Sequence, residues 1–166
     1  MRRIVEFLIM CAATVLASGT PLAAEPPTTA EVLAKIHRAN QKEMDMGRMA
    51  VQVGHAKDVR SFGKTLMNDH QAAEKKVQKL AKEENVALTE TAVANEESGL
   101  PTGDAFDATF AQRMLDDHQK LIVDLEAARE TTSDDKLKKL LGDLLPVLHR
   151  HESTAHHLVD QTTNRS

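Results

Sequence analysis

The chain has 166 residues, of which 41% are hydrophobic and only 2% aromatic, and its formal net charge is −4. This length suits a single domain. The scarcity of aromatic side chains argues against a β-sandwich and against binding of nucleic acid by base stacking. The negative charge offers a polyanion no overall attraction, so we expect no nucleic-acid partner.

The N-terminal segment, residues 1–24, has the three parts of a secretory signal peptide. Arg2 and Arg3 form a basic start, residues 4–17 are mostly apolar, and residues 18–24 are small and turn-rich. We predict cleavage near Ala24 and a periplasmic or secreted protein. The apolar run is shorter than the roughly 20 residues of a membrane span, so the mature chain has no predicted transmembrane domain. Glu6 interrupts this run and leaves an uncleaved anchor as the alternative.

The single cysteine, Cys11, lies inside the predicted signal. The mature chain therefore has no disulfide, no cysteine nucleophile and no thiolate metal site.

Helical periodicity follows a short linker at residues 25–29. It predicts four helices, at residues 29–53, 56–84, 104–130 and 133–161, the last opening at Ser133. Short connections make the first two helices one antiparallel pair and the last two another. Residues 85–103 are long enough to cross the bundle, as in ferritin-like folds, although a simple up-down-up-down bundle remains the alternative. We predict an all-α, ferritin-like four-helix bundle over residues 30–161, with a tail at 162–166.

Each predicted helix places one metal-competent side chain near its middle and on its apolar face. These side chains are Glu43, His70, His118 and His151. In antiparallel pairs, mid-helix positions fall in one layer, so a carboxylate and three imidazoles are expected to meet at the centre. Such donors suit Zn, Fe, Mn or Cu.

Other polar side chains project differently from the helices. Asp69 and Asp117 each precede one of the central histidines, where they orient an imidazole or face solvent. Six side chains project to the helix flanks, where we expect them to be solvated: His37, Glu74, Glu126, His149, His156 and His157.

Two segments around the central histidines repeat one another. Residues 62–71 align with 110–119, and the shared Phe, Asp, His and Gln fall at the same positions. Amphipathic helices alone do not require a shared Asp-His-Gln. The repeat therefore indicates equivalent positions for His70 and His118 on two helices.

These features recur in a known family. The segment from Phe62 to Asp69-His70, the later His118, and a last helix with Pro146, Leu148 and His151 together resemble a bacterial domain of unknown function whose exported members are often labelled outer membrane proteins. The resemblance covers about residues 30–160. It implies a ferritin-like four-helix fold, export to the periplasm, and no established activity.

Two interpretations of the central polar residues remain open. In the first, an exported bundle binds a transition metal in its core. In the second, an envelope protein with a structural or interaction role uses a buried Glu–His network and holds no metal. No Glu-x-x-His pair occurs at the phase that a di-iron site needs, and no catalytic motif is present, so a non-enzymatic role is favoured. The sequence does not identify a partner protein.

Overall fold

The computed structural model describes residues 25–89 and 101–163, and the predicted signal peptide lies outside them. This part of the chain forms four helices and no strand: α1 (Thr29–Val53), α2 (Lys57–Glu83), α3 (Asp104–Thr131) and α4 (Asp135–Thr163). The all-α bundle predicted from the sequence is confirmed, and each helix end lies within two residues of its expected position. None of these four helices is long and apolar enough to cross a membrane.

Side-chain caps define where two of the helices begin. The Thr28 hydroxyl accepts a hydrogen bond from the backbone N–H of Glu31, and the Glu31 carboxylate accepts one from the N–H of Thr28. At the start of α4, the Asp134 carboxylate accepts hydrogen bonds from the N–H groups of Lys136 and Leu137. Helix α4 therefore starts two residues later than predicted, because Asp134 and not Ser133 satisfies the free N–H groups.

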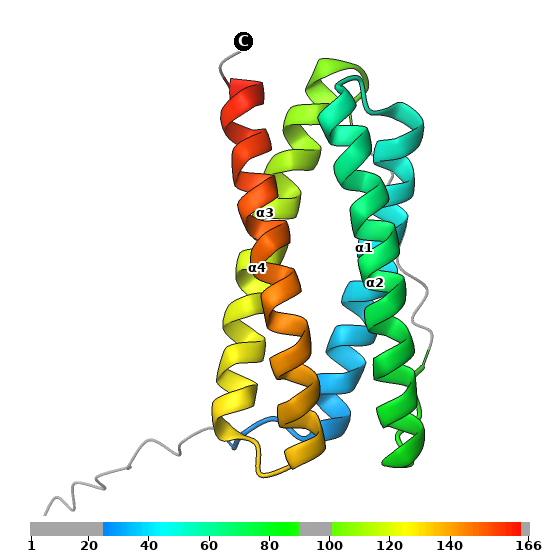
Figure 1. Cartoon of the computed structure of the whole chain (residues 1–166), viewed down its shortest axis with the longest axis vertical. Coiled ribbons are helices and arrows are strands. Elements are labelled where there is room, and N and C mark those ends of the chain that lie inside the picture. The colour runs from blue at the N-terminus through cyan, green and yellow to red at the C-terminus, as the bar shows by residue number, and fades with distance from the viewer. Residues whose placement is uncertain (1–24, 90–100, 164–166) are drawn as a thin grey trace, which may run out of the picture.

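The helices run up, down, down and up along the long axis of the bundle (Figure 1). At one end, Glu84 after α2 pairs with Lys136 at the start of α4. At the opposite end, Asp107 near the start of α3 accepts hydrogen bonds from the N–H groups of His55 and Ala56, between α1 and α2. The chain between α2 and α3 thus connects opposite ends, and the predicted long crossover is confirmed. Its residues 90–100 lie outside the described part.

The hydrophobic core is divided into two clusters by a polar layer. One cluster includes Ile36, Val77, Ile122 and Leu148, and the other includes Met46, Leu66, Met114 and Ala155. Apart from Asp107 near the start of α3, the buried polar residues of every helix lie between the positions that contribute to the two clusters. The bundle therefore buries its polar groups at mid-height, at the level predicted from the sequence.

Helices α1 and α2 come close together at two glycines. A Cβ atom on Gly47 would lie 2.6 Å from the carbonyl oxygen of Gly63, and the reverse distance is also 2.6 Å. Any side chain at either position would push the two backbones apart.

Candidate metal centre

Three imidazoles meet in the polar layer, one each from α2, α3 and α4. His70, His118 and His151 are all buried, and one nitrogen from each ring lies within 4.8 Å of the others. The repeated segments face each other across the core of the bundle, with 5.8 Å between the ring centres of His70 and His118 and 6.1 Å between those of Phe62 and Phe110. The structure thus brings together the three predicted histidines in one cluster.

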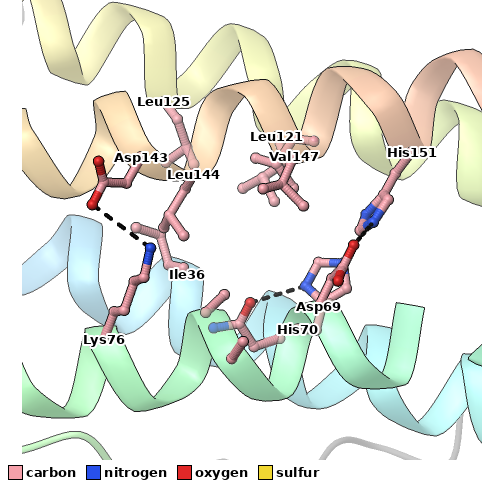
Figure 2. A pocket seen from close by; sticks show the side chains of 14 residues that line it. Ile36, Asp69, His70, Lys76, Leu121, Leu125, Asp143, Leu144, Val147 and His151 are labelled. Carbon is pink, nitrogen blue, oxygen red and sulfur yellow. Dashed lines mark hydrogen bonds and ion pairs between the residues drawn. The ribbon is translucent and has the colours of Figure 1, made fainter. Parts of the chain in front are cut away.

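The outward nitrogen of each ring has its own hydrogen-bond partner. Nδ1 of His118 is 2.8 Å from the carbonyl oxygen of Met114. Nε2 of His151 is 2.9 Å from a carboxylate oxygen of Asp69 (Figure 2). Nδ1 of His70 is 3.0 Å from the side-chain oxygen of Asn40. All three partners are acceptors, so these outward nitrogens carry the protons. Metal-binding histidines are held in the same way, by carbonyl or carboxylate groups behind the ring.

The inward nitrogens are therefore lone-pair donors as long as the rings stay neutral. Burial lowers the pKa of His70 well below its usual value and lowers that of His118 to about 4. Burial also lowers the pKa of His151, against the opposing effect of Asp69. At neutral pH the triad thus presents three unprotonated nitrogens to its centre.

Two of these lone pairs face each other without a proton between them. Nε2 of His118 and Nδ1 of His151 are 3.3 Å apart, and Nε2 of His70 is buried without a hydrogen-bond partner. A tetrahedral ion with metal–nitrogen bonds of about 2.0–2.1 Å separates its ligand nitrogens by about 3.3 Å. The donor types, their protonation and the spacing of this pair fit a bound cation, and the ligand nitrogen of His70 lies within 4.8 Å of the other two.

Glu43, the fourth predicted ligand, is buried but does not join this group. Its Oε1 lies 4.0 Å from Nδ1 of His118, on the side of the ring that faces the Met114 carbonyl. Its Oε2 is buried without a hydrogen-bond partner. Burial, aided by the nearby Asp117, raises the pKa of Glu43 to about 8. The Glu43 side chain is therefore neutral at pH 7 and lies behind His118.

The two aspartates named from the sequence occupy different environments. Asp69 contacts His151 across the bundle, and not His70, its neighbour in the chain. Its side chain is 39% exposed, so this carboxylate joins the triad to the surface. Asp117 instead forms an ion pair with Lys42, with 2.9 Å between Nζ and Oδ2.

Two residues expected to be solvated, His37 and Glu74, are buried, so that prediction is wrong. The Glu74 carboxylate lies 2.7 Å from Nδ1 of His37 and accepts a hydrogen bond of 3.0 Å from the Asn40 amide. Asn40 in turn holds His70, so a hydrogen-bonded chain leads from His37 to the triad. A helical projection assigns one buried face to each helix, whereas α1 and α2 bury flanking positions in their close contact. Glu74 lies four residues after His70, and residues four apart lie on the same face of a helix. This spacing from a predicted core residue was the signal that could have placed Glu74 in the core.

The other four side chains that were expected to be solvated are exposed. His149, His156 and His157 are exposed, as is Glu126, which pairs with His149. They lie outside the buried layer.

The fold is similar to that of a solved protein, CopM, whose structure was determined in a silver-bound form obtained by soaking. The TM-score is 0.70 at 16% sequence identity, and the similarity covers 82% of this chain and 98% of CopM. No curated protein sequence matches the chain. The profile of a domain of unknown function, DUF4142, matches residues 14–158. The chain therefore belongs to the DUF4142 family, in agreement with the resemblance noted in its sequence.

Proposed function

We propose that this protein binds a transition-metal ion through His70, His118 and His151 and acts in the periplasm. The observation that carries the proposal is the 3.3 Å contact between Nε2 of His118 and Nδ1 of His151. Both nitrogens are acceptors in the tautomers that the outer partners impose, so their lone pairs repel in the absence of a cation. A metal ion converts this repulsion into two coordinate bonds.

The donor set narrows the choice of metal. Neutral imidazoles suit Zn²⁺ and copper, whereas Mn²⁺ prefers carboxylate oxygens. Glu43, the carboxyl group that would favour Mn, stands behind His118 and outside the nitrogen cluster. A bundle of similar fold, CopM, holds silver after soaking, and silver(I) shares the ligand preferences of Cu(I). We therefore favour Zn²⁺ or copper over the harder metals.

Metal analysis of the untagged protein tests this proposal. After titration with Zn²⁺ or copper and removal of excess ion, we expect elemental mass spectrometry to find about one ion per chain. The His70→Ala/His118→Ala variant should lose this ion. A matched variant, His149→Ala/His156→Ala, removes two exposed histidines and should retain it. Equal metal content in the two variants, or none in the native protein, would overturn the proposal.

Export rests on residues 1–24, whose pattern is that of a signal peptide. When the whole chain is expressed in a bacterium, the periplasmic fraction should contain a protein whose N-terminus is Glu25. Intact mass measurement checks the cleavage site. A full-length mass in the membrane fraction would instead indicate an uncleaved anchor.

A structural role for the layer is the second candidate. The chain of hydrogen bonds through Asn40, Glu74 and His37 is complete without any ion, which is what a register-setting polar layer requires. Under this alternative, the protein binds no metal and leucines at the three triad positions leave it at least as stable. The unpartnered Nε2 of His70 weighs against this alternative.

A further inference from the structure

A cavity of about 100 Å³ adjoins the triad. A single water molecule needs roughly 10–15 Å³ by this measure, so the cavity holds several waters or a ligand of a few non-hydrogen atoms. Two of the three imidazoles, those of His70 and His151, line one end, together with Asp69 (Figure 2). Asn40, which contacts His70, also lines the cavity.

The walls and the mouth of the cavity differ in chemistry. The walls are aliphatic and come from all four helices; among them are Ile36, Leu121, Ala73 and Val147. Toward the surface, Lys76 and Asp143 form an ion pair with 3.6 Å between Nζ and Oδ2, and both side chains are about half exposed. The cavity therefore has a polar mouth, an apolar middle and an end lined by two imidazole rings.

We propose that this cavity holds an exchangeable fourth ligand of the metal, a small monovalent anion that donates one lone pair. This inference rests on the proposed metal site. The protein supplies three nitrogens to that site, and the nearby carboxyl group of Glu43 stands behind His118 instead of joining them. A tetrahedral ion then has one position left, and an open position is what distinguishes reactive or exchanging sites from closed structural ones.

Charge and solvation indicate the class of ligand. Three neutral imidazoles leave the full charge of a divalent ion uncompensated, so an anion is attracted. The aliphatic walls offer few hydrogen bonds, which disfavours strongly hydrated anions such as sulfate. The small volume excludes bulky ligands. Azide meets all three conditions and serves as the probe.

The test uses the protein loaded with Co²⁺, because the visible absorption of this ion reports its ligands. Azide should shift the spectrum of the loaded native protein in a saturable way. Val147→Phe and Ala73→Leu each fill the cavity, and they should retain Co²⁺ while weakening azide binding about tenfold or more, which is about 1.4 kcal/mol. A matched variant, Val123→Phe, adds the same bulk at an exposed position of α3 and should behave as the native protein does.

The outcomes separate this inference from the metal proposal. If Co²⁺ binds but azide leaves the spectrum unchanged, the site is closed and the inference fails while the metal site stands. If azide binds equally well to both cavity-filled variants, the ligand enters elsewhere and the inference fails. If Co²⁺ does not bind to the native protein, the metal proposal itself fails and this inference fails with it.

Discussion

Replacing Glu43 by Gln should stabilise the protein, and more so as the pH rises. Glu43 is buried in the core, and its Oε2 has no hydrogen-bond partner. Its pKa is about 8 in the folded protein, against 4.5 for an unperturbed glutamate. Ionisation of Glu43 in the unfolded chain therefore draws the equilibrium toward unfolding at neutral pH.

The size of the effect follows from this difference in pKa. Below pH 4.5 the carboxyl group is protonated in both states, so its ionisation does not change the free energy of unfolding. Between pH 4.5 and 8, ionisation of Glu43 in the unfolded chain lowers the free energy of unfolding by about 1.4 kcal/mol per pH unit. Glutamine resembles the neutral acid and does not ionise. The free energy of unfolding of the variant should thus exceed that of the native protein by less than about 1 kcal/mol at pH 5 and by roughly 3 kcal/mol at pH 7.

Urea denaturation followed by circular dichroism, in the presence of a chelator, measures this difference across the pH range. The histidines titrate in both proteins, so their contribution cancels in the comparison. Glu130→Gln, at an exposed position of α3, is the matched control and should leave the pH profile unchanged. A Glu43→Gln variant that is less stable than the native protein at pH 7 would contradict this prediction. It would show that the carboxylate is ionised and paired, with His118 as the nearest candidate.

Three further predictions concern the triad and its supports. Metal affinity should change little from pH 8 to 6 and fall only in acid, because burial lowers the pKa values of all three imidazoles, that of His118 to about 4. Metal titrations at a series of pH values check this, and a loss already near pH 6.5 would contradict it. Gly47→Ala should destabilise the bundle by about 1–3 kcal/mol, because the new methyl group would meet the Gly63 carbonyl. Gly142→Ala is the control and should be neutral or stabilising, because only the Arg129 side chain lies near Gly142. Thermal unfolding of the two variants compares them directly. Glu74→Gln keeps the shape but leaves one carbonyl oxygen for two buried donors, so it should cost about 1–3 kcal/mol and weaken metal binding about tenfold. Unchanged affinity in this last variant would show that the hydrogen-bonded chain does not hold His70.

The sequence alone determined the helices and the face of each that is buried. Apolar residues at helical spacing define a buried stripe whatever the partner helix is, so His70, His118 and His151 were correctly placed in the core from their positions on the stripe. Cap residues and loop lengths likewise depend on local chemistry. This is why the helix ends and the long crossover between α2 and α3 were predicted closely.

Which polar groups meet was decided only by the tertiary structure. Periodicity gives the direction of a side chain about its own helix axis, but a contact also depends on the rotation and offset of the neighbouring helix. Asp69 reaches His151, 82 positions away, and not the adjacent His70. The pairing of α1 with α2 buries the flanking His37 and Glu74 against each other, whereas a single-stripe projection assigns both to solvent. Glu43 was placed in the core correctly, yet its offset along α1 leaves it behind His118, because packing between helices and not the pattern within one helix sets that position.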